Sequence, residues 1–174
     1  MPKVKKIVIT GPESSGKTTL AKDLAKFFHA VYAPEYSRYY LASINRPYGI
    51  RDIPEIGKGQ LALHQDLVLE NTQILICDTS ILVLKMWFLH KYNIQNEWVD
   101  QAFQHDPVDL YLLCKPDIPW EPDPVRENPE DRDVLFEKYH KALVASGKPF
   151  SIIEGEHLPQ RKSQAIKLIQ SISP

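Results

Sequence analysis

The chain has 174 residues and a formal net charge of −1, with 43% hydrophobic and 25% charged residues. This length suits one domain with its own hydrophobic core, so we expect residues 1–174 to form a single domain. A nearly neutral chain lacks the positive field that attracts nucleic acids and anionic membranes, and neither is expected as a partner.

The first half of the sequence alternates apolar runs with segments of helical periodicity. Strands are expected at residues 4–10, 30–33 and 73–77. Helices are expected at 16–28, 36–44 and 55–71, with a loop containing proline and glycine at 45–53. This alternation is typical of parallel βαβ units.

The second half continues the pattern with a helix at 79–92, strands at 109–114 and 150–154, and a closing helix at 159–172. Residues 115–132 are rich in proline and charge and are too long for a simple connection, which favours a functional lid. No apolar run approaches the about 20 residues that span a bilayer, and the N-terminus reads as a first strand rather than a signal peptide. We therefore expect a cytoplasmic protein.

Residues 11–18, GPESSGKT, match the phosphate-loop pattern G-x-x-x-x-G-K-[ST] between an expected strand and an expected helix. The glycines allow backbone N–H groups to turn toward phosphate oxygens, and the amino end of the helix adds partial positive charge. Lys17 can reach the β- and γ-phosphates, and the Thr18 hydroxyl can ligate Mg²⁺. The sequence therefore predicts a site for a nucleoside triphosphate with Mg²⁺.

The nucleotide is assigned to Gly11, Glu13, Ser14, Ser15, Gly16, Lys17, Thr18 and Thr19. The polar side chains of Ser14, Ser15 and Thr19 could instead satisfy backbone groups of the loop. With this loop, the predicted fold is an α/β P-loop NTPase fold: a five-stranded parallel sheet with helices on both faces and a lid insertion.

Two acids stand at expected strand ends, where ligands of an open parallel sheet bind. Asp78 closes an apolar strand and is a candidate Mg²⁺ ligand, although an aspartate there could also cap the next helix. Glu35 follows the second strand and could accept a proton from an acceptor hydroxyl, or be a solvated residue of a helix's first turn. The two roles could also be exchanged.

The expected lid carries Arg126 and Arg132, which could stabilise the charge that develops on a transferred phosphoryl group. The alternative is a solvated charged loop. Trp120 lies within this polar segment, and an aromatic ring in such a position favours a ring-bearing substrate as a stacking partner.

These segments together resemble the nicotinamide riboside kinase domain of the bacterial NAD-biosynthesis regulator. The resemblance rests on the GPESSGKT loop, PEYSRYY at 34–40, LALHQ at 61–65, Asp78-Thr79, and W-x-x-D-x-x-R from Trp120 to Arg126. It implies ATP-dependent phosphorylation of the 5′-hydroxyl of nicotinamide riboside, which gives nicotinamide mononucleotide. It also implies substrate contacts from Glu35, Tyr36, Arg38, Trp120 and Asp123, with Trp120 near the pyridine ring and Asp123 at the ribose.

The resemblance covers only the kinase part of that regulator, so repression of transcription is not expected. Two alternatives to nicotinamide riboside kinase stay open at this point. One is a kinase of another nucleoside or small metabolite, and the other is a nucleotide-binding switch that signals by conformation.

Overall fold

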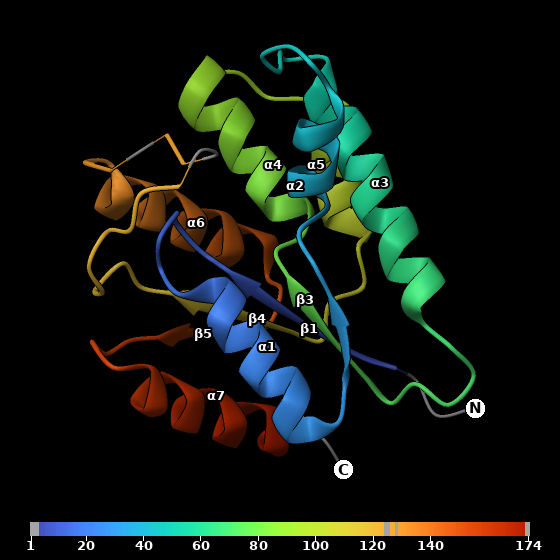
Figure 1. Ribbon diagram of the computed structural model, residues 1–174, viewed down its shortest axis with the longest axis vertical. Helices are drawn as coiled ribbons and strands as arrows, with labels where there is room; N and C mark the ends of the chain where they lie inside the picture. The colour runs from blue at the N-terminus through green and yellow to red at the C-terminus, as the bar shows by residue number, and fades with distance from the viewer. Residues whose placement is uncertain (1–3, 124–125, 128, 173–174) are drawn as a thin grey trace.

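A computed structural model describes residues 4–123, 126–127 and 129–172, and its centre is a five-stranded sheet (Figure 1). The strands run in the order β2-β3-β1-β4-β5, and all four neighbouring pairs are parallel. Their bounds are β1 Lys5–Thr10, β2 Val31–Ala33, β3 Ile74–Asp78, β4 Leu110–Cys114 and β5 Phe150–Ile153. The predicted five-stranded parallel sheet is confirmed.

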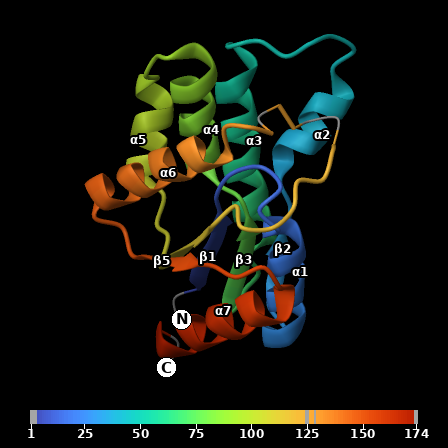
Figure 2. The ribbon, with the colours of Figure 1, turned by 90° about the vertical axis from the view of Figure 1, so that its left-hand side faces the viewer.

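Helices cover both faces of the sheet, as predicted. Their bounds are α1 Lys17–Phe28, α2 Tyr36–Ser43, α3 Asp52–Leu67, α4 Ile81–Trp87, α5 Glu97–His105, α6 Arg132–Ser146 and α7 Leu158–Ile172, with a π-helical turn η1 over Phe88–Tyr92. Figures 1 and 2 show α1 and α7 on one face and α3 to α6 on the other. None of the helices in the described part of the chain is long and apolar enough to cross a membrane.

The side chains of β1 alternate between the two faces and so supply both cores. Ile7 and Ile9 pack with α1 and α7, whereas Val8 packs with the helices on the opposite face. All three are fully buried. A strand covered on both faces is apolar over most of its length, which explains the apolar runs of the sequence.

The boundaries of two helices, α3 and α4, differ from the sequence prediction. Helix α3 begins at Asp52, inside the expected loop, and ends at Leu67, four residues before the expected end. Helix α4 begins at Ile81 because Thr79 has a left-handed φ of 72° and cannot belong to a helix. The hydroxyl of Ser80 accepts a hydrogen bond from the N–H of Leu82 at 3.5 Å and caps α4.

The sequence analysis did not predict α5 and α6. Helix α5 buries Val99 and Phe103, and α6 buries Leu135, Phe136, Tyr139 and Leu143. The apolar positions of α6 are separated by charged residues, so its helical period is visible only once the buried face is known. Helix α5 does show helical spacing, with Trp98 and Val99 one turn before Ala102 and Phe103, but the sequence analysis did not assign that segment. Both helices add to the core on the face of the sheet that also carries α3 and α4.

The two neighbours Leu143 and Val144 test the packing of α6. Leu143 is fully buried, whereas Val144 is 58% exposed. Leu143→Ala should lower the free energy of unfolding by about 2–5 kcal/mol, because it leaves a cavity under the helix. Val144→Ala should change that free energy by less than about 0.5 kcal/mol. Denaturant unfolding of both variants measures the difference, and equal losses would contradict the placement of α6.

Candidate functional site

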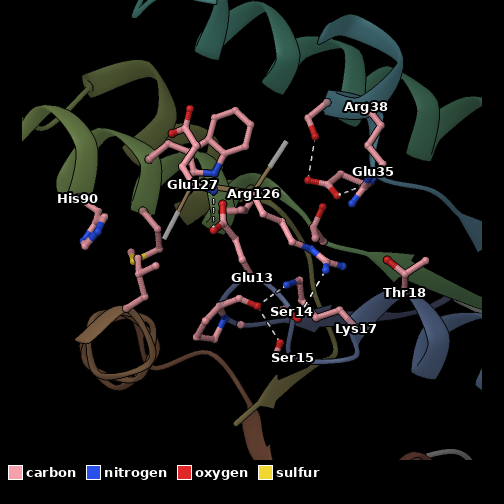
Figure 3. Close-up of a pocket in the computed structure, with 18 of the residues that line it drawn as sticks. Glu13, Ser14, Ser15, Lys17, Thr18, Glu35, Arg38, His90, Arg126 and Glu127 are labelled. Atoms are coloured by element: carbon pink, nitrogen blue, oxygen red, sulfur yellow. Dashed lines mark hydrogen bonds and ion pairs between the residues drawn. The ribbon is translucent and has the colours of Figure 1, made fainter. Parts of the chain in front are cut away.

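The predicted phosphate loop connects β1 to α1 at the carboxyl edge of the sheet (Figure 3). Gly11 has a φ of 136°, and a Cβ at this position would lie 2.6 Å from the carbonyl oxygen of Cys114. Gly16 directly precedes α1 with a φ of 76°. A side chain would be strained at both positions, so the two glycines of the motif allow the tight turn that leads the chain from strand to helix.

The side chain of Lys17 folds back over its own loop. Its Nζ donates a hydrogen bond to the carbonyl oxygen of Pro12 at 2.5 Å. Burial lowers the pKa of Lys17, while the negative charges of Glu35 and Asp78 act in the opposite direction. The ammonium group is therefore poorly hydrated and lies within electrostatic range of two carboxylates, so it is suited to attract phosphate oxygens.

A cavity of about 480 Å³ opens beside this loop, a volume typical of small-molecule sites. Most of the predicted site residues line it: Gly11, Glu13, Ser14, Ser15, Gly16, Lys17, Thr18, Thr19, Glu35, Arg38 and Arg126. The other predicted residues do not: Tyr36, Asp78, Trp120, Asp123 and Arg132. The structure thus brings the phosphate loop, the end of β2 and the lid to one cavity.

Glu35 follows β2, and its carboxylate is only 16% exposed, which argues against a solvated surface residue. Burial raises the pKa of Glu35, and a hydrogen bond from Ser37 and the charge of Lys17 partly oppose this. The Ser37 hydroxyl donates to Oε1 at 2.8 Å, and Nε of Arg38 lies 3.5 Å from Oε2. Figure 3 shows Glu35 and Arg38 close together, on the opposite side of the site from Ser15. A raised pKa makes this carboxylate a better proton acceptor.

Arg38 and Tyr36 take different positions in α2. Nη1 of Arg38 lies 3.2 Å from Oδ2 of Asp123, so the pair joins α2 to the lid. The ring of Tyr36 packs against α3, where a Cβ on Gly59 would come within 2.1 Å of the ring. Tyr36 therefore holds α2 on α3, and its predicted contact with substrate stays a prediction.

Asp78 lies at the end of β3 and is 2% exposed. Its Oδ2 accepts a hydrogen bond from the Tyr32 hydroxyl at 3.3 Å, while Oδ1 is buried without a hydrogen-bond partner among the described residues. The buried hydroxyls of Thr10 and Thr79 are likewise without partners in that part of the chain. Because Ser80 caps α4, the alternative that Asp78 is the helix cap is wrong.

These orphaned oxygens fit the donors that Mg²⁺ takes in a nucleotide site. Within the described residues no cluster of three or more His, Cys, Asp or Glu side chains could hold a metal by itself. Mg²⁺ does not need such a cage, because it keeps several waters and uses one or two protein groups together with phosphate oxygens. Asp78 and the cavity-lining Thr18 are the side chains suited to hold it.

The lid contacts the phosphate loop at Ser14. The Ser14 hydroxyl accepts hydrogen bonds from the N–H of Glu121 at 2.8 Å and from Nη1 of Arg126 at 3.5 Å. Nη1 of Arg132 donates to the Ser14 carbonyl at 3.1 Å and to that of Ile118 at 2.9 Å. Both predicted arginines therefore reach the loop. Residues 124, 125 and 128 of the predicted lid lie outside the described residues.

Trp120 lies against these two arginines and away from the cavity lining. Its ring centroid is 6.0 Å from Cζ of Arg126 and 5.8 Å from Cζ of Arg132, within the range of cation–π contacts. The predicted stacking of Trp120 on a substrate ring stays a prediction. For that stacking, the indole ring would have to move away from the two arginines or contact the arginines and the substrate together.

The sequence analysis missed a group of cavity-lining residues distant from the phosphate loop in sequence. Tyr48 and Trp87 have ring centroids 5.5 Å apart. Nζ of Lys91 donates to the Tyr48 hydroxyl at 2.8 Å and to Glu127 of the lid at 3.0 Å. All four residues line the cavity. They come from three separate segments, so no motif marks them.

Arg161 of α7 was also missed. It is 1% exposed, and its guanidinium donates to the carbonyl oxygens of Ser15 at 2.7 Å, Lys115 at 2.7 Å and Gly155 at 2.6 Å. It also pairs with Asp117. A buried guanidinium with this many acceptors ties the phosphate loop to the chain that follows β4 and β5. In the sequence it is one arginine of an amphipathic helix.

Comparison with known proteins identifies proteins that are similar over most of this chain. A family model described as an AAA domain (AAA_28) matches residues 6–161. The trifunctional NAD biosynthesis/regulator protein NadR of Escherichia coli (strain K12) is 26% identical over 97% of this chain. This chain spans 43% of that protein's length.

Solved structures share the fold. Crystal structures of NadR protein, one in complex with NAD and AMP-PNP and one with NR, match 97% of the chain with TM-scores of 0.77 and 0.75 at 24% and 22% identity. The chain covers 49% and 51% of those structures. Thymidylate kinase from Ehrlichia chaffeensis matches with a TM-score of 0.70 at 15% identity, over 97% of this chain and 100% of that one. The predicted resemblance to the NAD-biosynthesis regulator and the predicted P-loop kinase fold are confirmed.

Lys17→Ala tests the phosphate loop. Removing the ammonium should weaken binding of a non-hydrolysable ATP analogue by about 10- to 100-fold, the usual effect of one charge-assisted hydrogen bond. Because burial lowers the pKa of Lys17, its charged form is disfavoured in the folded protein and opposes folding, so the melting temperature of the ligand-free variant should be no lower than that of the wild type. Lys22→Ala, on the exposed side of α1, is the control and should bind normally. Normal affinity in a folded Lys17→Ala protein would overturn the assignment.

Proposed function

Since the chain belongs to the AAA_28 family of AAA domains, we propose that it is an ATP-dependent kinase that phosphorylates the 5′-hydroxyl of nicotinamide riboside and forms nicotinamide mononucleotide. The observation that best supports a kinase is the buried carboxylate of Glu35, which lines the same cavity as the phosphate loop and Lys17. The choice of nicotinamide riboside rests on similarity to NadR over 97% of the chain, including structures solved with NR and with an ATP analogue.

In the proposed reaction, the 5′-hydroxyl oxygen attacks the γ-phosphorus of ATP and the bond from that phosphorus to the β–γ bridging oxygen breaks. Glu35 takes the hydroxyl proton, and ADP leaves with the bridging oxygen. Lys17 stabilises the charge on the β- and γ-phosphates. When bound, Mg²⁺ neutralises charge on the same phosphates, and Asp78 and Thr18 are the residues proposed to hold it.

The lid supplies the remaining positive charge in this proposal. Arg126 and Arg132 both hydrogen-bond to Ser14, so a small movement of their guanidinium groups brings them to the transferred phosphoryl oxygens. Asp123, next to Arg38 at 3.2 Å, is proposed to contact the ribose, and Trp120 the pyridine ring. Closure of this segment would also exclude water, which otherwise competes with the acceptor for the phosphoryl group.

An acceptor screen with radiolabelled ATP tests the proposed function. Phosphate should be transferred to nicotinamide riboside in preference to uridine, adenosine and thymidine, and transfer to water should be slower than to any accepted nucleoside. Transfer to a different nucleoside alone would contradict the proposed substrate and keep the kinase. Transfer only to water would favour a nucleotide-binding switch instead.

The variants Glu35→Gln and Asp78→Asn separate the two acids. Glu35→Gln should lower kcat by roughly 10²–10⁴, because the amide cannot accept the proton, and added Mg²⁺ should not restore activity. Asp78→Asn should instead raise the Mg²⁺ concentration needed for half-maximal activity, with partial recovery at high Mg²⁺.

The pH profile gives a second measurement of Glu35. Since burial raises the pKa of Glu35, wild-type kcat should increase as the pH rises through that raised value. Glu35→Gln should not show this increase on the acid side of the profile, the acid limb. Rescue of Glu35→Gln by Mg²⁺, with none for Asp78→Asn, would show that the two roles are exchanged.

A further inference from the structure

Gln60, a buried polar side chain of α3, contacts the chain on both sides of Glu35 without lining the cavity that contains it, and His64 of the same helix contacts Gln60. Each is 4% exposed. Oε1 of Gln60 accepts a hydrogen bond from the backbone N–H of Tyr36 at 2.8 Å. Nε2 of Gln60 donates to the backbone carbonyl oxygen of Pro34 at 3.1 Å. The peptide groups before and after Glu35 are therefore held by one amide.

The orientation of the Gln60 amide follows from these partners. The Tyr36 N–H requires an acceptor and the Pro34 carbonyl requires a donor, so the oxygen and nitrogen of the amide cannot be exchanged. The second N–H of the amide lies toward Nε2 of His64, at 2.8 Å. Burial lowers the pKa of His64 to about 3, so the ring is neutral at ordinary pH and Nε2 accepts this hydrogen bond. His64 thus holds Gln60 in one orientation.

Gln60 also replaces the cap that Glu35 does not provide. Glu35 occupies the N-cap position of α2, where an acidic side chain commonly accepts a hydrogen bond from the first turn, but here it makes no such bond. The Gln60 side chain accepts from the first N–H of α2 instead. The Glu35 carboxylate is therefore released from capping and contacts Ser37 and Arg38 at the cavity.

A purely structural role explains this arrangement less well. Buried polar groups stabilise a fold only when each is satisfied, and apolar residues of similar volume would pack α3 against β2 without that requirement. The Gln60 amide directs two of its hydrogen bonds to the peptide groups before and after Glu35, and the imidazole of His64 accepts the third. Misplacement of a catalytic group by about 1 Å can cost 10²-fold in rate.

We propose that Gln60, oriented by His64, is a positioning residue that holds Glu35 in the geometry for accepting the substrate proton. This inference rests on the proposed function, in which Glu35 is the proton acceptor. It gives a role to His64 of the LALHQ segment, none of whose residues lines the cavity that contains Glu35.

Gln60→Met tests the inference, because it keeps the volume and removes all three hydrogen bonds. It should lower kcat for nucleoside phosphorylation by about 10- to 100-fold, with KM for ATP and the Mg²⁺ requirement close to wild type. The acid limb of the pH profile should also shift. Gln65→Met makes the same substitution at an exposed position of the same helix and should leave all of these quantities unchanged.

The double variant Gln60→Met/Glu35→Gln gives the decisive measurement. If Gln60 acts through Glu35, the double variant should be no slower than Glu35→Gln alone, because there is no proton acceptor left to position. Losses that multiply would overturn the inference. His64→Leu, which removes only the acceptor for the second N–H of Gln60, should show a smaller loss that is likewise absent with Glu35→Gln, and it replaces Gln60→Met if that variant does not fold.

The two proposals fail in different ways. A wild-type protein that transfers phosphate to no nucleoside would overturn the proposed function and this assignment with it. An active wild type in which Gln60→Met keeps full kcat, or in which the losses multiply, would overturn only the role of Gln60.

Discussion

Parallel strands all end at the same edge of their sheet, and the candidate site depends on this directional constraint. In the register of the sheet, Ile9 of β1 pairs with Asp78 of β3, and Ala33 of β2 pairs with Cys77. The phosphate loop begins directly after β1, and Glu35 follows two residues after Ala33. The phosphate loop and Glu35, from the ends of two different strands, therefore meet at one cavity, and Asp78 lies at the same edge of the sheet.

This same edge contains residues with unfavourable backbone conformation and unsatisfied polar atoms. Ser14 and Thr79 adopt left-handed conformations although neither is glycine. The side chains of Thr10, Asp78 and Thr79 bury oxygens that find no partner within the described residues. Strain and orphaned polar atoms persist where the surrounding structure enforces them, and they are typical of sites that await a ligand. Arg161 contributes to that enforcement through its buried hydrogen bond to Ser15.

The helices on the two faces of the sheet support different parts of the site. Helix α7 holds the phosphate loop through Arg161, and α3 holds the chain around Glu35 through Gln60. Both supports use buried polar side chains that donate to backbone carbonyl oxygens. A site that requires fixed positions for a phosphate loop and a carboxylate is thus built on two packed helices rather than on loops.

The sequence by itself determined the positions of the strands along the chain and the phosphate loop, because both depend on local properties. Apolar runs report burial on both faces of a sheet, and Gly11 and Gly16 report backbone turns that only glycine allows. The acids at positions 35 and 78 could be named because a strand end is visible as the last residue of an apolar run. Helix boundaries were less accurate, since the left-handed Thr79 has no local signal.

Only the tertiary structure decided which distant side chains complete the site. Tyr48 and Lys91 belong to segments that come together because α3 and α4 pack against each other. Their contact with each other and with Glu127 of the lid cannot be predicted from any single segment. For Trp120, the sequence shows that the residue lies in a polar loop, but it does not predict the contacts of the ring with Arg126 and Arg132. Local propensity sets the conformation of a segment, whereas a contact between segments depends on how whole faces pack, and a sequence window does not contain that information.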